Sequence, residues 1–465
     1  MRNRRLAVLM TVLALVAAAC GGDRGEDTST PSTTDAPSDT TEDTESDGDE
    51  PGPGDYGTLT DVCGPNEGGG TLPDLGDDEL LGITEDSIEV GTVSDPGYEQ
   101  RPGLNQEIFD AATAFVEWCN QAGGINGKTL TLNLHDAAIL EYQPVVEEAC
   151  RTDFALVGAG AVQDNLWPDV GAACGLIDIA GFSVTPQKAG FVGEDLIANR
   201  SVQAIPNASD QVGVGANRLL QEEFPEAAQA TGFIYGDLQT LVTVYERYAE
   251  GWENAGHTVV HAEPYNSIAG ESNWQPFVIG LQDDGVEFLN FVGEGQNLAL
   301  LQRAMAEVGY SPEVTLQETN FYDEEYLAAA GDAADGTFIR SVLWPFFEAD
   351  ENPATQRYID TVEAIDGKIA TLGAQSTSAW LLFAQAVKEC DLANELSRSC
   401  VLETAAAVSD WDAGGLHAPT NPSENVASEC VVVLQVVEGE FTRWAPDDGY
   451  YCDEENVVDI GRTAE

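Results

Sequence analysis

Basic residues are scarce in this chain of 465 residues, which has 19 lysines and arginines against 81 aspartates and glutamates. Only four of the basic residues are lysines. A formal net charge of −62 repels nucleic acid and anionic membrane surfaces, and it keeps a protein soluble. Nucleic acid is therefore excluded as a partner, and the acid excess is interpreted as a solvated surface.

The sequence also lacks the common signatures of catalysis and metal binding. It contains no Gly-x-Ser-x-Gly elbow, no P-loop and no His-Glu-x-x-His motif. The run 158–160 begins like a dinucleotide fingerprint, but Gln163 stands where the third glycine would be. His257 and His261 lie along a predicted strand without a third ligand nearby. No enzyme activity, metal or cofactor is predicted.

The one long apolar run is confined to the start of the chain. Leu6 to Val16 follows three arginines and precedes Ala17-Ala18-Ala19-Cys20. This run is too short for a stable membrane anchor and has the layout of a secretory signal, residues 1–20. The small residues before Cys20 resemble a bacterial lipobox, which implies cleavage there and lipid attachment to the thiol. A plain signal peptide cut nearby is the alternative.

Residues 21–60 are predicted to be a disordered acidic tether. Residues 21–55 are almost all Gly, Asp, Glu, Ser, Thr and Pro, and none is aromatic. Such a segment cannot bury enough apolar surface to offset its chain entropy. The expected location is the outer face of a bacterial cell membrane, held by a lipid anchor.

Eight cysteines remain once Cys20 is set aside, an even number that suits an oxidising compartment. No Cys-x-x-Cys spacing suggests a redox pair or a zinc knuckle. The order of the predicted elements favours four disulfides among many possible pairings: Cys150 with Cys174, Cys390 with Cys400, Cys430 with Cys452, and Cys63 with Cys119. Cys119 also suits a buried apolar position.

One stretch, residues 88–136, has the pattern of a complete strand–helix–strand unit. A β-branched run from Ile88 to Ser94 stops at Asp95-Pro96-Gly97, as a strand entering a loop does. Apolar residues at helical spacing follow, and the glycine-rich run from Ala122 to Lys128 ends the helix. Leucines then alternate with polar residues up to Asp136. The unit predicts two parallel strands joined by a right-handed crossover.

The same alternation continues to residue 205 and starts again after Pro206. We therefore predict an α/β fold with two doubly wound parallel-sheet lobes, the first beginning with residues 86–205 and the second covering 206–340. The second lobe is expected to open with a helix capped by Ser209 or Asp210. Residues 341–425 are predicted to be helical and to return to the first lobe.

Several of these segments resemble type I periplasmic binding proteins, most of all the leucine/isoleucine/valine-binding group that feeds ABC importers of branched-chain amino acids and amides. The resemblance rests on the unit 88–136 with its Ala-Gly-Gly-Ile-Asn-Gly-Lys turn, on residues 150–158, on Gly-Phe-Ile-Tyr-Gly-Asp at 232–237 and on Asp-Gly-Thr-Phe at 335–338. It implies a hinge with a ligand cleft between the lobes. It also places a C-terminal hairpin, residues 426–452, on the second lobe.

The function that this resemblance implies is capture of a small polar ligand, such as an amino acid or amide, by hinge closure. An ABC permease and its ATPase would then be the partners that receive the ligand. A surface sensor of the same fold, not coupled to transport, is the alternative, and the sequence leaves both open.

Ligands of this architecture bind in loops at the carboxyl ends of parallel strands. The candidate contacts are Asp95, Tyr98, Gly160, Ala161, Val162, Gln163, Phe182, Ser183, Asp237, Thr240, Glu294, Gln296, Glu318 and Asn320. In the family, the loop matched by 160–163 presents backbone N–H groups to a ligand carboxylate, and the acid matched by Glu318 pairs with a ligand ammonium. Phe182 and Thr240 depart from the pattern, which has a small residue and an aromatic there. A glycosidase pair of Glu294 and Glu318 is the alternative for these acids.

Overall fold

The computed structural model of the chain describes residues 52–462, so the predicted signal peptide, Cys20 and most of the predicted tether lie outside the described residues. Residues 52–60, which the prediction assigned to the tether, are folded. Tyr56 is only 1% exposed, and its ring packs edge-on against Trp118, with centroids 5.4 Å apart. The predicted boundary is therefore wrong by several residues, because the first aromatic of the segment anchors it to the first lobe.

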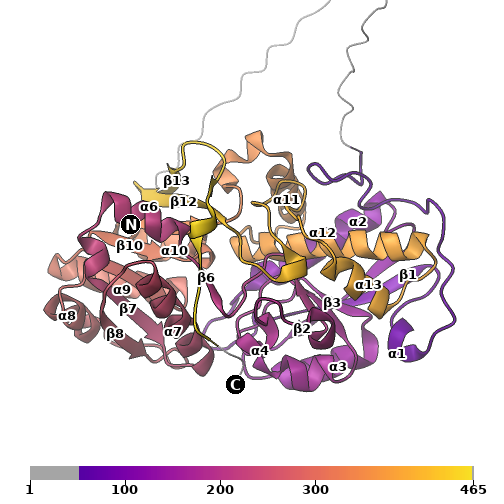
Figure 1. Cartoon of the computed structure of the whole chain (residues 1–465), viewed down its shortest axis with the longest axis horizontal. Helices are drawn as coiled ribbons and strands as arrows, with labels where there is room; N and C mark the ends of the chain where they lie inside the picture. Colours follow the sequence, from indigo (N-terminus) through magenta and orange to yellow (C-terminus); the bar gives the residue numbers. More distant parts are fainter. Residues whose placement is uncertain (1–51, 463–465) are drawn as a thin grey trace, which may run out of the picture. The chain divides into compact units, whose positions relative to one another are not determined.

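The first lobe contains a five-stranded parallel sheet in the order β2-β1-β3-β4-β5 (Figure 1). Its strands are β1 (Ser87–Ser94), β2 (Thr129–Asp136), β3 (Ala155–Val157), β4 (Ile177–Ala180) and β5 (Ser201–Gln203). Its first helices are α1 (Asp77–Leu80), α2 (Gln106–Ala122), α3 (Tyr142–Thr152), α4 (Pro186–Ala189) and α5 (Leu196–Asn199). β1 pairs with β2 in parallel from Ser87 opposite Thr129 to Ser94 opposite Asp136. The predicted strand–helix–strand unit is confirmed.

The second lobe contains a larger sheet in the order β13-β12-β11-β10-β9-β7-β8. Its strands are β7 (Thr231–Gly236), β8 (Val259–Tyr265), β9 (Phe288–Val292), β10 (Val314–Gln317), β11 (Thr337–Ser341), β12 (Cys430–Val437) and β13 (Glu440–Ala445). Its helices are α6 (Gly215–Glu223), α7 (Gln239–Asn254), α8 (Gln275–Asp283), α9 (Gly295–Val308) and α10 (Glu324–Ala330). β7 to β11 are parallel, and the hairpin β12–β13 adds antiparallel strands at one edge.

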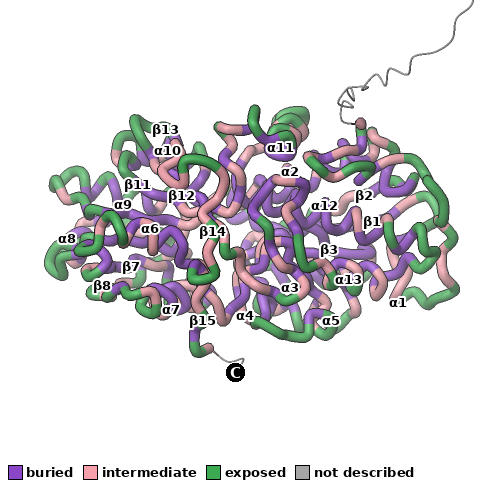
Figure 2. Tube along the Cα trace, turned by 45° about the horizontal axis from the view of Figure 1, so that its top comes forward, coloured by how far each residue is buried: buried purple, intermediate pink, exposed green. Residues whose placement is uncertain are grey.

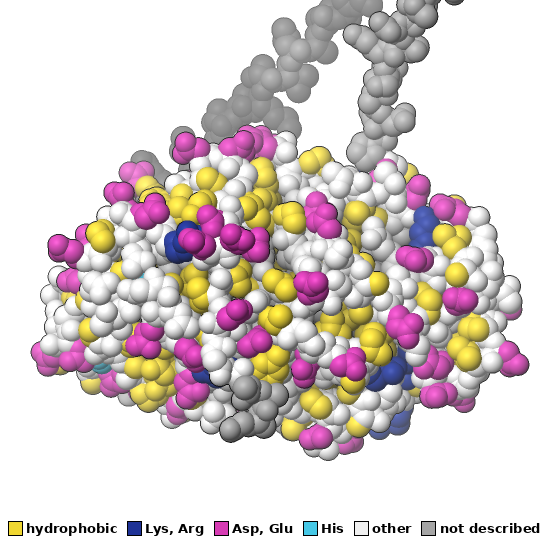
Figure 3. Space-filling model, viewed as in Figure 1, with side chains coloured by type: hydrophobic (Ala, Val, Ile, Leu, Met, Phe, Trp, Pro, Cys, Tyr) yellow, Lys and Arg dark blue, Asp and Glu magenta, His cyan; other side chains and the backbone are white. Residues whose placement is uncertain are grey.

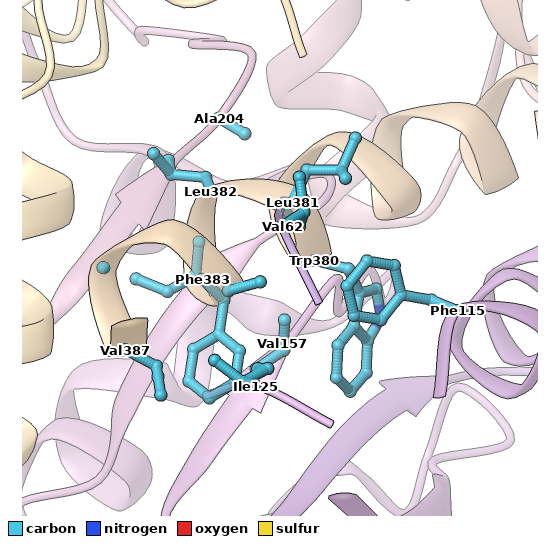
Figure 4. Packing of buried hydrophobic residues seen from close by; sticks show 14 of the residues in the cluster. Val62, Phe115, Ile125, Val157, Ala204, Trp380, Leu381, Leu382, Phe383 and Val387 are labelled. Atoms are coloured by element: carbon cyan, nitrogen blue, oxygen red, sulfur yellow. The ribbon is translucent and has the colours of Figure 1, made fainter. Parts of the chain in front are cut away.

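Helices late in the chain complete the first lobe. They are α11 (Pro353–Glu363), α12 (Thr371–Leu392) and α13 (Arg398–Ala406). α12 is buried on nearly all sides because it packs against α2, α13 and the sheet. Figure 4 shows Trp380 and Phe383 of α12 in this cluster, and the Trp380 ring stacks on Phe115 of α2 with centroids 5.3 Å apart. The chain thus crosses between the lobes three times within residues 52–462: after β5, after β11 and before β12.

The segment joining the lobes differs from the prediction. In place of a helix starting at Ser209 or Asp210, the chain forms β6 (Gln211–Gly213) before α6 begins. β15 (Val457–Asp459) pairs antiparallel with β6. A partner strand so distant in sequence leaves no local signal, so the pattern around residue 210 predicted a helix. β14 (Tyr451–Cys452) lies at the end of the segment predicted as a hairpin and pairs antiparallel with β12, whereas β15 lies beyond that segment.

The structure forms four disulfides, and they join the predicted pairs: Cys63–Cys119, Cys150–Cys174, Cys390–Cys400 and Cys430–Cys452. The first ties the N-terminal segment to α2. Beside it, the Gly64 N–H donates to the Gly124 carbonyl at 2.6 Å, so this segment covers the glycine turn after α2. Figure 2 shows the buried interior of each lobe, and Figure 3 shows acidic side chains spread over the face in view with few basic ones among them.

Candidate ligand-binding site

A cavity with a volume of about 240 Å³ lies between the two lobes. Its walls come from the loops that follow the carboxyl ends of the strands in both sheets, from β1 and β3 in the first lobe to β9 and β10 in the second. Loops converge at these ends in doubly wound sheets, which is the general reason that ligands bind there. The location therefore agrees with the cleft that the sequence predicts.

Most of the cavity wall is apolar. The first lobe contributes Leu104, Ile139, Val162, Phe182, Val184 and Leu372, and the second contributes Leu238, Leu241, Val244, Ile268, Phe291 and Val342. Such a wall favours a ligand with an apolar body, and polar side chains such as Asn105, Asn320 and Gln375 also line it. The small polar ligand expected from the sequence therefore stays a prediction.

Among residues 52–462, four charged side chains line the cavity: Arg247, Glu294, Glu318 and Arg340. All four belong to the second lobe. The Arg340 Nε donates to a Glu318 carboxylate oxygen, and its Nη1 donates to the Gly213 carbonyl at 3.1 Å. Burial acts to lower the pKa of Arg340, but Glu318 and Tyr248 outweigh it and raise that pKa. Glu318, the predicted partner of a ligand ammonium, is therefore engaged by a cation of the protein itself.

Arg247 lies on α7 and is 5% exposed. Its Nη1 donates to the backbone carbonyls of Asn207 and Ala208 at 3.2 and 3.1 Å, and its Nη2 donates to the Asn207 side-chain oxygen at 2.8 Å. The guanidinium also lies over the Tyr248 ring, 5.3 Å from its centroid. Its Nε has no hydrogen-bond partner among the described residues. The charge is thus held by neutral oxygens alone.

At the rim of the cavity, cations of the first lobe meet acids of the second. Arg101 lies 3.4 Å from Glu294 and 3.2 Å from Glu325 (Nε–Oε2 and Nη2–Oε2). Lys368 Nζ lies 2.8 Å from Asp323 and also approaches Glu325 at 3.4 Å. Burial raises the pKa of Glu294, and Arg101 opposes that rise. These pairs hold the lobes together over the cavity.

One predicted contact, Tyr98, takes part in the same closure. Its hydroxyl donates to the Ile268 carbonyl of the second lobe at 2.9 Å. Its ring belongs to a small apolar cluster with Leu104 and Ile139, against which Ile268 packs. Tyr98 therefore joins the two lobes without lining the cavity.

Half of the fourteen predicted contacts line the cavity: Gly160, Ala161, Val162, Phe182, Glu294, Glu318 and Asn320. The others do not, and they are Asp95, Tyr98, Gln163, Ser183, Asp237, Thr240 and Gln296. Asp237 accepts hydrogen bonds from Ser267 and so braces the loops after β7 and β8. Gln296 is exposed.

Two buried carboxylates organise the loops of the first lobe. Asp95 accepts from the N–H groups of Ile139 and Val162 at 2.6 and 2.8 Å. Asp164 accepts from the N–H groups of Val184 and Thr185 at 2.8 and 3.0 Å, and burial raises its pKa to about 6 against those bonds. Burial likewise raises the pKa of Asp95. Asp95 was predicted to contact the ligand, but its side chain is fully buried and bonds to the protein backbone.

Two of the four backbone donors of loop 160–163 are occupied. The Gly160 N–H donates to the Val93 carbonyl at 2.9 Å, and the Val162 N–H is held by Asp95. A ligand carboxylate would have to compete with these two bonds, and the role that the resemblance implies for this loop stays a prediction.

Sequence reasoning missed Arg247, Arg340 and Gln375, which all line the cavity. A signal existed for Arg247. It lies on the same face of α7 as the buried residues Thr240, Gly251 and Trp252, where the helix should be apolar. A cation on a buried face is costly unless it has a partner or a role, and basic residues are scarce in this chain.

A sequence profile described as periplasmic binding protein matches residues 179–440. The chain belongs to the periplasmic binding protein family. The sequence matches none of the curated proteins. No cluster of three or more metal-ligating side chains occurs in residues 52–462, and none of their helices is long and apolar enough to cross a membrane.

Solved structures show the same fold as this periplasmic binding protein. A fatty acid ABC transporter substrate-binding protein from Thermomonospora curvata aligns with a TM-score of 0.68 at 16% identity, over 83% of this chain and 97% of its own. A leucine-binding protein from Thermotoga maritima aligns with a TM-score of 0.63 at 14% identity, over 77% of this chain and 97% of its own. The TM-scores establish a common fold, and the two named ligands differ greatly in polarity.

Proposed function

We propose that this periplasmic binding protein is the extracytoplasmic solute-binding component of an ABC importer, and that its ligand has a largely apolar body. The observation that carries the proposal is the aliphatic and aromatic lining of the cavity between the lobes. Ligand sites of this kind bury most of the ligand surface and orient it with a few polar groups. The name of the Thermomonospora protein, which shares the fold, is consistent with such a ligand.

Closure of the hinge couples capture to delivery in this proposal. The ligand binds one lobe first, and contacts from the other lobe then favour the closed state. The ion pairs that Arg101 and Lys368 form at the rim stabilise that closed state. A membrane permease with its ATPase receives the ligand, and a lipid on Cys20 keeps the protein near them.

Calorimetry on the purified protein, after bound lipid is removed, tests the ligand class. Decanoic acid and 1-decanol are expected to bind, with thermal stabilisation that grows with ligand concentration. Leucine, glutamine and acetamide, as small polar comparisons, are expected to give neither heat nor a thermal shift. Binding of the polar set without binding of either decyl compound would contradict the proposed ligand class.

The anchor has a separate test. Expression of Cys20→Ala in a bacterial host with a lipoprotein pathway should release the protein from the membrane fraction, while the unaltered chain should remain there and incorporate radiolabelled palmitate. Equal fractionation of the two forms would remove the lipid from the proposal and leave the binding function untouched.

A further inference from the structure

We propose that Arg247, together with Arg340, makes one end of the cavity an anion-binding end that selects ligands with a terminal monoanionic group, the simplest being a carboxylate. This inference rests on the proposed function, because it concerns the head group of the same apolar ligand. It differs from that proposal in naming the sign of the charge and the side chains that hold it.

The first argument is the charge balance of Arg247. Arginine remains protonated at any ordinary pH, so its burial is costly unless an anion or several oxygens face it. Arg247 has three oxygen acceptors, all neutral, and forms no ion pair with any described carboxylate. Its buried Nε has no hydrogen-bond partner among the described residues, and Arg247 itself lines the cavity.

A second buried arginine shows what a purely structural role looks like. Arg398 of the first lobe uses Nε and both terminal nitrogens on backbone carbonyls, including those of Phe154 and Asp153 at 2.8 and 2.6 Å. It does not line the cavity, and burial lowers its pKa to about 10. Arg247 differs in both respects, since it keeps a free donor and faces the cavity.

The neighbourhood of Arg247 adds a second cation. Arg247 and its neighbour Tyr248 both lie at the cavity wall with Arg340. Arg340 is neutralised by Glu318, so the cluster of two arginines and one glutamate keeps a net positive charge. A monoanion restores neutrality at this end, whereas an ammonium would add a second uncompensated cation. A charge-assisted bond from arginine to a carboxylate is about twice as strong as a neutral one.

The first lobe offers an anion no comparable site. Its lining contains no lysine, arginine or histidine within the described residues, and several of its loop N–H groups are held by Asp95 and Asp164. The carboxylate therefore lies at the second-lobe end, and the apolar tail extends along the aliphatic and aromatic wall. This orientation is opposite to a carboxylate held by loop 160–163.

The test compares decanoate, 1-decanol and decylamine, which share one tail, on the full chain by calorimetry or by displacement of a fluorescent fatty acid. Decanoate should bind more tightly than decanol, and decylamine most weakly. Arg247→Met should weaken decanoate by about 10- to 100-fold, the range for loss of one charge-assisted bond, and should change decanol by less than about threefold. Arg303→Met, which removes an exposed arginine of α9, is the matched control and should change neither.

Three results would overturn the inference. Decanol binding as tight as decanoate to the unaltered protein would do so while leaving the proposed function intact. Equal weakening of decanoate and decanol by Arg247→Met would show a role in packing only, and Arg247→Lys, which keeps the charge, should separate these cases by retaining the preference for decanoate. Absence of binding by both decanoate and decanol would overturn the proposed ligand class, and the inference with it.

Discussion

The second lobe supplies every charged side chain that lines the cavity in residues 52–462, whereas the first lobe lines it with aliphatic, aromatic and amide groups. At the rim the pattern reverses, because the first lobe presents Arg101 and Lys368 to glutamates and an aspartate of the second. The two lobes therefore contribute differently to the cavity and to its rim. Both lobes contribute apolar residues to the wall. The first lobe adds the cations that pair across the rim, and the second adds the charged side chains of the lining.

The most direct way to break this division is to place a charge on the neutral wall. Val184 lies in the loop after β4, lines the cavity and is half-buried. We expect Val184→Glu to weaken decanoate binding by about 100-fold, because it places a second anion in a poorly hydrated cavity against an apolar wall. Val184→Gln introduces a side chain of nearly the same size as glutamate but without the charge, so it should weaken decanoate binding far less. Titration calorimetry measures the decanoate affinity of both variants. Similar losses of affinity would mean that the shape of this wall matters and its charge does not.

The two lobes also share a feature that lies outside the cavity. Each lobe buries one neutral histidine, His417 in the first and His257 in the second, and burial lowers the pKa of each from its ordinary 6.5 to about 4. His417 Nε2 lies 2.8 Å from the Ser378 hydroxyl, and His257 Nδ1 lies 2.9 Å from the Thr231 hydroxyl.

Between pH 6.5 and 4 the unfolded chain binds a proton at each histidine that the folded chain does not bind. The free energy of unfolding should therefore fall as the pH falls through this window, by about 2 kcal/mol for each histidine between pH 7 and pH 5. Denaturant titrations at both pH values should show that His417→Gln and His257→Gln each flatten this dependence. An unchanged slope in either variant would mean that its histidine is protonated in the folded protein.

The rim pairs should act on release of the ligand more than on its capture. We expect the double variant Arg101→Gln/Lys368→Met to raise the dissociation rate of decanoate about five- to tenfold at low salt, since partly exposed ion pairs contribute about 1 kcal/mol together. Stopped-flow displacement measures this rate. High salt should bring the unaltered protein towards the variant, because it screens the same pairs.

Lys388→Met is the matched control for the rim variant. Lys388 contacts Asp61 and Glu67, which belong to the same lobe, so its loss should leave the dissociation rate unchanged. A rate in the double variant equal to that of the control would show that Arg101 and Lys368 do not stabilise the closed state.

Much of the fold could be predicted from the sequence because the signals are local. The unit 88–136 carries its strands, its helix and its glycine turn within one stretch, and the structure confirms it. β6 could not be predicted in this way, since its partner β15 lies at the other end of the chain. The same reason explains Tyr56, whose burial depends on α2 and not on its own neighbours.

The location of the site could be predicted from the sequence, but the roles of its residues could not. Sequence placed Gly160, Phe182 and Glu318 at the cleft because strand ends converge there. It could not tell that the Asp95 side chain turns inward to hold two loops, or that Glu318 is already paired by Arg340. Both outcomes depend on side-chain directions set by contacts between distant segments, and the polar ligand predicted from the resemblance depended on those same residues.

Glu318 offers the subtlest way to sharpen the comparison between the lobes. In the structure its carboxylate neutralises Arg340, so Glu318→Gln should free that guanidinium for the ligand. Arg340 keeps its bond to the Gly213 carbonyl and so stays in place. We expect decanoate affinity to rise about threefold, a modest gain because Arg247 already binds the head group, and decylamine affinity to fall. Calorimetry with the two ligands measures both shifts, and Glu313→Gln, which removes an exposed carboxylate just before β10, serves as the control. A loss of binding in Glu318→Gln would instead assign Glu318 to a cationic ligand, as the resemblance implied, and would make the second lobe an ammonium site.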